Sequence, residues 1–401
     1  RGICTILYGM RDLLGWEPIM EGETIIGLAD VTGGGAISLE PGGQFELSGA
    51  PLENIHQPSR ELHAHLAHLR EVSRPLGIGF AAVGMSPAWT RAQTPVMPKG
   101  RYKIMAAYMP KVGNLGLDMM FRTCTVQANL DFSSEADMVK KMRVGIAWQP
   151  VATAMFANSP FTDGKPNGFL SFRAEIWRDT DPDRTGTLPF VFEPGMGFER
   201  YADYVLDVPM YFIKRGSQYI DVSGTSFRDL LAGKNPKAPG ERATISDWAN
   251  HLSTAFPEVR LKRYLEMRGA DNGPMDRICA LPALWAGLLY CQPALDEAWS
   301  MVKDWTVEER EKLRADVPKL GLNAEIRGRK VRDLAREMLK FARAGLTQRM
   351  QLDITGRDET RYLDPLEAIV EANETPAEAL LKLYNGPWKK SVDPIFDLLA
   401  Y

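Results

Sequence analysis

Three segments of this chain alternate between apolar and polar residues, with Arg263 as the one exception, and this pattern constrains the fold more than any other feature. The segments are residues 123–132, residues 37–48 on both sides of the turn Pro41-Gly42-Gly43, and residues 259–268. Because successive side chains of a β-strand point to opposite faces, each segment predicts strands with one apolar and one polar face. Strands of this kind are typical of antiparallel sheets that pack helices against one side.

The polar faces of the first two segments combine carboxylates with amides and contain no Lys or Arg. They consist of Thr123, Thr125, Gln127, Asn129 and Asp131, and of Ser38, Glu40, Gln44, Glu46 and Ser48. The third polar face consists of Arg260, Lys262, Tyr264, Glu266 and Arg268. These faces could simply meet water, as polar faces of antiparallel sheets often do.

Their composition favours a metal site instead, because hard divalent cations such as Mg²⁺ bind carboxylate oxygens first and amide oxygens next. If the sheet curls round a common space, four residues could supply such ligands: Glu40, Glu46, Gln127 and Glu266. Arg268 would then lie beside the metal, where a guanidinium suits a transferring phosphate.

Composition excludes several other classes of protein. The 401 residues contain 48 Lys plus Arg against 51 Asp plus Glu, so the chain lacks the basic surplus of nucleic-acid-binding proteins. The apolar run 278–291 is shorter than the ~20 residues of a membrane span, so we expect a buried helix there. Four cysteines without a CxxC pair favour a reducing, cytoplasmic setting over a disulfide scaffold or a structural zinc site.

Helix-start signals and Gly/Pro-rich connections predict an α+β fold. A capping residue with an acidic residue three positions later occurs at Ser134, Thr244, Thr306 and Thr375. Residues 25–267 mix strand-like and helical patterns, whereas residues 274–401 are almost entirely helical in pattern. We expect a catalytic region with a mainly antiparallel sheet at residues 1–273 and a helical portion at 274–401, packed together as one unit.

The sequence contains no glycine-rich nucleotide-binding loop, and its histidine cluster does not indicate a metal site. A Walker-type loop is absent, and Gly77-Ile78-Gly79 followed by Gly84 has the wrong spacing for a dinucleotide fingerprint. Any nucleotide must therefore be held through metals and side chains. Helical spacing turns His63 away from His65 and His68, so we interpret these histidines as helix-surface residues.

Several long stretches resemble one known family. Residues 38–49, 97–102, 122–127, 158–170 and 256–271 strongly resemble the plant-type glutamate–cysteine ligases, a group shared with proteobacteria, and the resemblance covers nearly the whole chain. It implies a fold related to glutamine synthetase, in which a curved antiparallel sheet forms a funnel around substrates and metals. It also implies the first step of glutathione synthesis, in which ATP phosphorylates the γ-carboxylate of glutamate and the cysteine amine attacks the acyl phosphate.

The resemblance also implies roles for individual residues. The residues that bind Mg²⁺ in the family correspond to Glu40, Glu46, Gln127 and Glu266 of this sequence. Asn129 would line the same strand as Gln127, and Arg268 would contact the transferring phosphate, with Glu266 and Arg268 as the catalytic pair.

Three further residues correspond to the family's substrate site. Arg173 would bind an amino-acid carboxylate, Trp177 would form a wall of the site, and Tyr211 would belong to the cysteine pocket. Each has a structural alternative, because Arg173 could be an ordinary ion-pair partner and the two aromatic residues could belong to the core.

The sequence departs from the family in two places. Family members carry an acidic G-T-E-H-E motif before the region where this chain begins, so we expect a segment that completes the metal site to be missing from the sequence. The plant enzymes have regulatory disulfide cysteines at positions that hold Ser59, Ser223 and Lys237 here, which leaves Cys279 unpaired. We therefore expect no redox switch of that kind, and a bacterial origin rather than a plastid one.

Two other functions stay open. The chain could be an ATP-dependent carboxylate–amine ligase with a different amine acceptor, or a catalytically silent homologue that binds glutamate or nucleotide. For the preferred function we expect glutamate, cysteine and ATP as partners, Mg²⁺ as cofactor, neither nucleic acid nor membrane as partner, and a monomer or homodimer.

Overall fold

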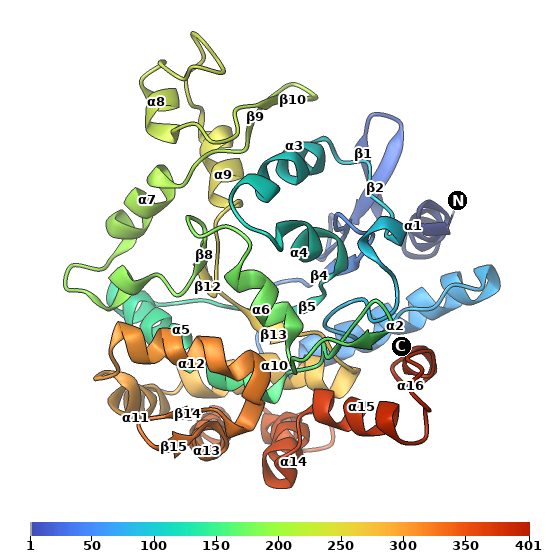
Figure 1. Cartoon of the computed structure of the whole chain (residues 1–401), viewed down its shortest axis with the longest axis vertical. Helices are drawn as coiled ribbons and strands as arrows, with labels where there is room; N and C mark the ends of the chain where they lie inside the picture. Colours follow the sequence, from blue (N-terminus) through green and yellow to red (C-terminus); the bar gives the residue numbers. More distant parts are fainter. Residues whose placement is uncertain (1) are drawn as a thin grey trace.

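Helices surround two antiparallel sheets and several short hairpins in the computed structural model, which describes residues 2–401 (Figure 1). The α+β class with mainly antiparallel strands is therefore confirmed. The two larger sheets have four and three strands, and they carry the polar faces recognised in the sequence; the other strands form two-stranded pairs, of which β8 (Thr185–Gly186) with β11 (Phe256–Pro257) is parallel.

The four-stranded sheet has the order β1-β2-β3-β4, and every neighbouring pair is antiparallel. Its strands are β1 (Glu17–Glu21), β2 (Thr24–Ala29), β3 (Ala36–Leu39) and β4 (Phe45–Ser48). The turn Pro41-Gly42-Gly43 joins β3 to β4, as predicted. A Cβ at Gly42 would lie 2.0 Å from the carbonyl oxygen of Phe121, so only glycine allows this close approach to the neighbouring chain segment.

The three-stranded sheet has the order β12-β13-β5, with β12 (Val259–Leu261), β13 (Leu265–Asp271) and β5 (Thr125–Leu130). The prediction of one strand over residues 259–268 is wrong, because a turn closed by the bond from Lys262 N–H to the Tyr264 carbonyl makes it a hairpin. The alternation continues across the turn because each residue of β12 pairs with a residue of the same polarity on β13. Polar Arg260 lies opposite polar Glu266, and the apolar residues lie opposite apolar residues.

The rest of the first two thirds of the chain forms helices and short strands. The helices are α1 (Gly2–Leu14), α2 (His56–Ser73), α3 (Gly100–Tyr108), α4 (Gly116–Arg122), α5 (Glu135–Met155), α6 (Phe172–Arg178), α7 (Phe198–Asp207), α8 (Phe227–Leu231) and α9 (Ile245–Leu252). The short strands among them are β6 (Phe161–Thr162), β7 (Lys165–Pro166), β8 (Thr185–Gly186), β9 (Phe212–Arg215), β10 (Gln218–Asp221) and β11 (Phe256–Pro257).

The C-terminal third is helical, as predicted, and gathers on one side of the molecule in orange and red (Figure 1). Its helices are α10 (Met275–Leu289), α11 (Gln292–Val302), α12 (Val307–Leu320), α13 (Val331–Arg349), α14 (Asp364–Ala372), α15 (Pro376–Asn385) and α16 (Ile395–Leu398). A small hairpin, β14 (Glu325–Ile326) and β15 (Arg329–Lys330), interrupts them.

The predicted helix starts are confirmed. The hydroxyls of Thr244, Thr306 and Thr375 each cap a helix, and the acidic side chain three residues later binds back to the backbone of the cap. Ser134 also caps its helix. Its acidic partner Asp137 binds the backbone of Ser133 instead.

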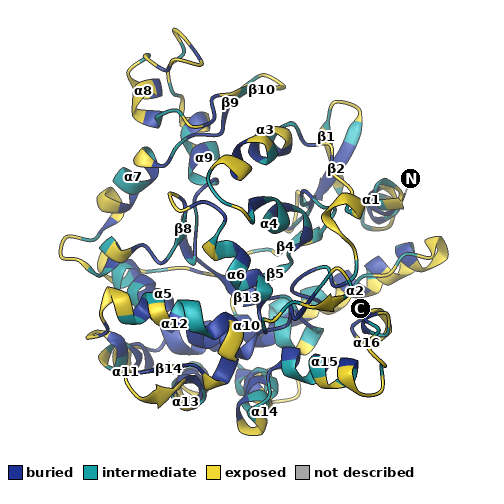
Figure 2. Cartoon of the chain, viewed as in Figure 1, coloured by how far each residue is buried: buried dark blue, intermediate teal, exposed yellow. Residues whose placement is uncertain are grey.

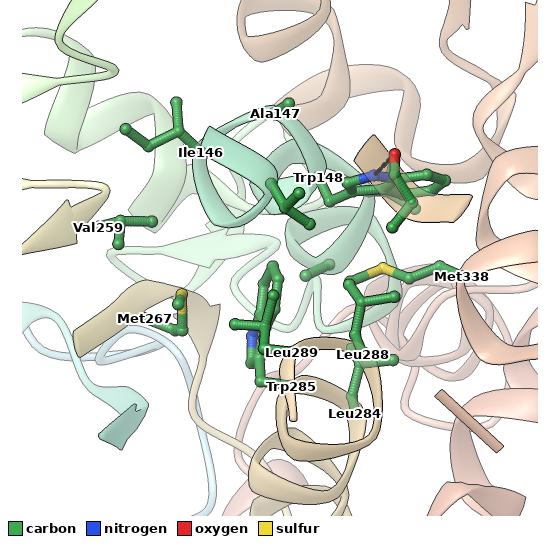
Figure 3. Packing of buried hydrophobic residues seen from close by; sticks show 14 of the residues in the cluster. Ile146, Ala147, Trp148, Val259, Met267, Leu284, Trp285, Leu288, Leu289 and Met338 are labelled. Carbon is green, nitrogen blue, oxygen red and sulfur yellow. Dashed lines mark hydrogen bonds between the residues drawn. The ribbon is translucent and has the colours of Figure 1, made fainter. Parts of the chain in front are cut away.

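One hydrophobic core joins the three-stranded sheet to the C-terminal helices. Figure 3 shows Trp148 of α5 and Met267 of β13 packed with Leu284 and Trp285 of α10 and Met338 of α13, all buried. The predicted buried helix at 278–291 is therefore confirmed, and α10 is largely dark blue in Figure 2. This core crosses the predicted boundary at residue 273; the division into two regions stays a prediction.

Within residues 2–401 the structure has no single helix long and apolar enough to cross a membrane. The pair α10 and α11 reaches that length and composition only together, and the pair is bent by 88° at its junction.

Candidate active site

Strand β13 carries Glu266 and Arg268 at the centre of the candidate site. Glu266 is buried, and its Oε2 accepts hydrogen bonds of 2.7 Å from Arg260 Nε and from Arg268 Nη1. Lys262 Nζ lies 3.5 Å from the other carboxylate oxygen, Oε1. Burial opposes ionisation of this carboxyl group, but the charges of Arg268 and Arg260 hold the pKa of Glu266 well below its ordinary value.

A β-bulge sets the direction of Arg268. Met267 lies opposite Ala128 and Ala270 lies opposite Val126, so Arg268 and Gly269 together face the single residue Gln127. The bulge thus places Gln127 beside the catalytic pair predicted from the sequence. Asn129 lies opposite Glu266 in the same ladder, so the polar faces of β5 and β13 meet as the alternation predicted.

A cavity opens beside Arg268, between β13 and α6. It has about 300 Å³ of empty volume, part of it open to solvent, and its lining includes Arg173, Trp177, Phe256, Glu258 and Arg268. The guanidinium carbons of Arg268 and Arg173 lie 5.7 and 5.9 Å from the centre of the Trp177 ring, so two cations lie close to one indole.

Arg173 and Trp177, which line this cavity, each have one hydrogen-bond donor without a partner among the described residues. Arg173 Nη2 donates to the Arg268 carbonyl oxygen over 2.7 Å, yet Arg173 Nε and Trp177 Nε1 are buried and have no hydrogen-bond partner within residues 2–401. A buried donor without an acceptor costs free energy, so an anionic ligand with oxygen atoms fits this place.

The predicted acidic residues of the four-stranded sheet lie close to the same centre. Glu40 stands in the β3–β4 turn, and its Oε1 is 3.5 Å from the Tyr102 hydroxyl. Glu46 on β4 is exposed, but surrounding protein still removes part of its hydration. This loss, with the negative charges of Glu40 and Glu266, raises the pKa of Glu46 to about 7.

The donor chemistry of this region suits Mg²⁺, because three carboxylates act on one another and a bound cation would relieve their repulsion. They are not assembled into a closed site, however: within the part of the chain that the structure describes, no three His, Cys, Asp or Glu side chains are arranged to hold a metal ion. Of the Glu266 oxygens, Oε2 is taken by two arginines, and Oε1, which has only the longer 3.5 Å contact with Lys262 Nζ, is the oxygen with more room for a metal.

Two basic residues beside the acidic ones were not singled out in the sequence. Lys99 and Arg101 lie at the start of α3, and Lys99 is buried. Burial lowers the pKa of Lys99, although the charges of Glu40 and Glu46 oppose this effect. The stretch 97–102 was noticed for its resemblance, but a Lys and an Arg two apart are too common to indicate a site.

Tyr211 is not among the residues that line the cavity. It is buried, its ring packs edge-on against Tyr108, and the guanidinium carbon of Arg184 lies 3.9 Å from its ring centre. Its hydroxyl has no hydrogen-bond partner within residues 2–401, and its assignment to a cysteine pocket stays a prediction.

Positions named for the family's disulfides lie in contact in this chain. Burial raises the pKa of the Cys279 thiol, and the neighbouring Ser59 side chain opposes this effect. Lys237 Nζ donates to the Ser223 carbonyl oxygen over 2.7 Å. The histidine interpretation needs one correction, because His65 is buried and stacks on Phe45 rather than facing solvent. Burial lowers the pKa of His65 to about 4.

Comparison with known proteins identifies the family. The model of glutamate-cysteine ligase family 2 matches residues 4–397. The chain is 57% identical over 399 residues to the chloroplastic glutamate–cysteine ligase of Medicago truncatula, covering 100% of this chain and 77% of that protein. It is 56% identical over 399 residues to the chloroplastic glutamate–cysteine ligase of Arabidopsis thaliana, covering 100% of this chain and 75% of that protein.

Among solved structures, the chain is similar to the Pup ligase PafA of the prokaryotic ubiquitin-like modification pathway, solved in complex with ADP. The TM-score is 0.39 at 12% identity, over 97% of this chain and 72% of PafA, and a likeness this low supports no functional argument.

The relatives overturn one expectation. The cytoplasmic location inferred from the cysteines is wrong, because the similar ligases are chloroplastic proteins. Sparse, unpaired cysteines report the redox state of a compartment and do not say which compartment it is. Because the family model matches nearly the whole chain and the relatives are more than half identical to it, the chain belongs to glutamate–cysteine ligase family 2.

Proposed function

We propose that this protein joins the γ-carboxylate of glutamate to the amine of cysteine at the expense of ATP, with Mg²⁺ as cofactor. One observation carries the proposal: two buried arginines, Arg173 and Arg268, lie close to Trp177 at one cavity in a chain whose family carries out this ligation. Two cationic groups at one place suit a substrate that brings both a carboxylate and a phosphate.

The reaction needs an activated carboxylate, because a free carboxylate is a poor electrophile. A glutamate γ-carboxylate oxygen attacks the terminal phosphorus of ATP and ADP leaves. The cysteine nitrogen then attacks the acyl carbon, inorganic phosphate leaves, and the nitrogen loses a proton. Arg268 would stabilise the transferring phosphoryl group by charge and position, which supply most of the catalysis in this type of transfer.

Glu266 orients Arg268 through the 2.7 Å bond to its Nη1. Arg173 would hold an amino-acid carboxylate with its unused Nε, and Trp177 would close one side of the site. Asn129, which lies opposite Glu266, and Tyr211 are the remaining proposed substrate residues.

The proposed Mg²⁺ ligands are Glu40, Glu46, Gln127 and the Oε1 atom of Glu266. When bound, Mg²⁺ neutralises phosphate charge. The side chains of Lys99 and Arg101, whose charges interact with Glu40, would help to balance the charge of the nucleotide phosphates.

The direct test measures ADP release from ATP and Mg²⁺ with glutamate alone, with cysteine alone and with both, together with detection of γ-glutamylcysteine. Release that requires both amino acids supports the ligase. Equal turnover with an unrelated amine in place of cysteine would point to another carboxylate–amine ligase, and binding without any turnover to a silent homologue. A version extended by the family's acidic motif shows whether that segment completes the metal site.

Arg268→Lys provides the residue-level test. Lysine keeps the charge but loses the planar fork of donors, so we expect kcat to fall by about 10²–10³-fold. The control is Arg263→Lys, at an exposed position in the β12–β13 turn, which should leave kcat unchanged. Equal kcat values for the two variants would remove Arg268 from the mechanism.

A further inference from the structure

The last residue of β13, Asp271, is a buried carboxylate for which the proposed reaction has no use. Only 1% of its surface is exposed. Its Oδ2 accepts hydrogen bonds from the Asn158 N–H at 2.8 Å and the Ser159 hydroxyl at 2.6 Å, and its Oδ1 accepts one from the Ser171 hydroxyl at 2.8 Å. Three donors from outside the strand therefore converge on one carboxylate.

Both hydroxyls extend this contact to helix α6. Ser159 Oγ accepts the Arg173 N–H at 3.1 Å, and Ser171 Oγ accepts the Ala174 N–H at 3.2 Å as the N-cap of the helix. A hydroxyl has one proton and two lone pairs, so a hydroxyl that donates to Asp271 presents its lone pairs to the helix. The carboxylate thus orients two relays, namely the chain of hydrogen bonds from Asp271 through Ser159 to the Arg173 N–H and the chain through Ser171 to the Ala174 N–H. Hydrogen bonds linked in such a chain strengthen one another.

The network ties α6 to the strand that carries Arg268. Asp271 lies three residues after Arg268, and Arg173 Nη2 donates to the Arg268 carbonyl oxygen. Backbone and side chain of Arg173 are therefore held by two points of the same strand. A Cβ at Gly84 would lie 2.7 Å from the Asp271 side chain, so the backbone of the loop that contains Gly84 packs closely against this side chain.

We propose that Asp271 is a positioning residue that holds the first turn of α6 against the end of β13 and so sets the place of Arg173 and Trp177 in the cavity. The consequence for substrate binding rests on the proposed function, in which Arg173 holds an amino-acid carboxylate. The consequence for the structure of α6 does not depend on that function.

The experiment uses Asp271→Asn, which keeps the size of the side chain but replaces one acceptor oxygen by an NH₂ group. We expect the amide hydrogen of Arg173 or of Ala174 to exchange at least about tenfold faster, because the serine hydroxyl that faces the new NH₂ group loses its acceptor and meets a donor instead. We expect KM for at least one amino-acid substrate to rise about tenfold or more, with KM for ATP changed less than about twofold.

Ser159→Ala and Ser171→Ala each remove one relay and keep the proposal testable if Asp271→Asn fails to fold. Each should speed amide exchange in α6 and raise KM for an amino-acid substrate, by a smaller factor than Asp271→Asn does. In the Ser171→Ala background, Asp271→Asn should add less than it does alone, because the two residues act through one network.

The matched control is Glu359→Gln, outside the cavity. Glu359 is also buried and accepts the Ile55 N–H at 2.6 Å and Arg349 Nε at 3.1 Å. It should lower stability without changing α6 exchange or either KM. The proposal is overturned if Asp271→Asn, Ser159→Ala and Ser171→Ala behave like this control. Faster α6 exchange in a protein that shows no ligation would instead support the positioning role and reject the proposed function.

Discussion

His251 on α9 shows how the surroundings of one residue make stability depend on pH. The residue is buried, its Nε2 donates to the Val205 carbonyl oxygen over 2.8 Å, and its ring stacks on Phe227. Burial lowers the pKa of His251 to about 4, so the folded protein holds a neutral imidazole. In the unfolded chain the ring takes up a proton near its ordinary value of about 6.5.

We therefore expect stability to fall as the pH decreases from about 6.5 to about 4, because only the unfolded state binds the proton in this range. The free energy of unfolding of the wild type relative to His251→Gln should decrease by about 3 kcal/mol between pH 7.5 and pH 4. Urea unfolding of both proteins across this range measures it. A difference that stays constant with pH would show that His251 is not the titrating group.

At the same scale, the sequence identified the site residues unevenly. Glu266 and Arg268 stood out because both lie on the polar face of an alternating segment, and the structure joins them by a 2.7 Å bond. Lys99 did not stand out, because its burial comes from the packing of α3 against distant residues. A local pattern reports which face a residue occupies, but not which distant group meets it there.

At the scale of elements, α10 and α13 approach one another closely enough for their backbones to touch. A Cβ at Gly345 would lie 1.9 Å from the Gly287 carbonyl oxygen, and a Cβ at Gly287 would lie 2.2 Å from the Ala342 carbonyl oxygen. The two helices are packed at paired glycines, and any side chain at this crossing would force them apart.

Gly345→Ala should therefore destabilise the protein by roughly 1–3 kcal/mol or more, although alanine favours an isolated helix by about 1 kcal/mol. Urea unfolding measures the change. The control is Ala344→Gly on the exposed side of the same helix, which should cost about 1 kcal/mol because only helix propensity changes there. A stabilising Gly345→Ala would mean that the helices can separate without cost.

At the scale of the whole molecule, the core in Figure 3 connects the sheet region to the C-terminal helices. Chains of this size often unfold in steps, yet here the same buried cluster includes Met267 of β13 and Leu284 of α10. We expect one cooperative transition, in agreement with the prediction that residues 1–273 and 274–401 pack as one unit.

Met267→Ala and Leu284→Ala test this expectation from the two sides of the core. Each should lower the free energy of unfolding by about 2–5 kcal/mol and shift the same transition. Far-ultraviolet circular dichroism and tryptophan fluorescence should give coincident curves for the wild type and both variants. A second transition that responds to only one variant would divide the molecule into two cooperative units.

The sequence by itself determined the features that depend on neighbours along the chain. Alternation marked the polar faces of β3, β4, β5 and β13, and the capping pairs at Thr244, Thr306 and Thr375 marked where helices begin. These signals are local because they arise from backbone geometry and from hydrogen bonds that span only a few residues.

Only the tertiary structure decided which faces meet. Residues 259–268 alternate identically whether they form one strand or a hairpin, and the fold chose the hairpin that sets Arg260 against Glu266. The approach of Arg173 to Arg268, across 95 residues of sequence, and the anchoring of α6 by Asp271 leave no pattern along the chain. They result from packing between elements, whose hydrogen-bond partners exist only once the chain is folded.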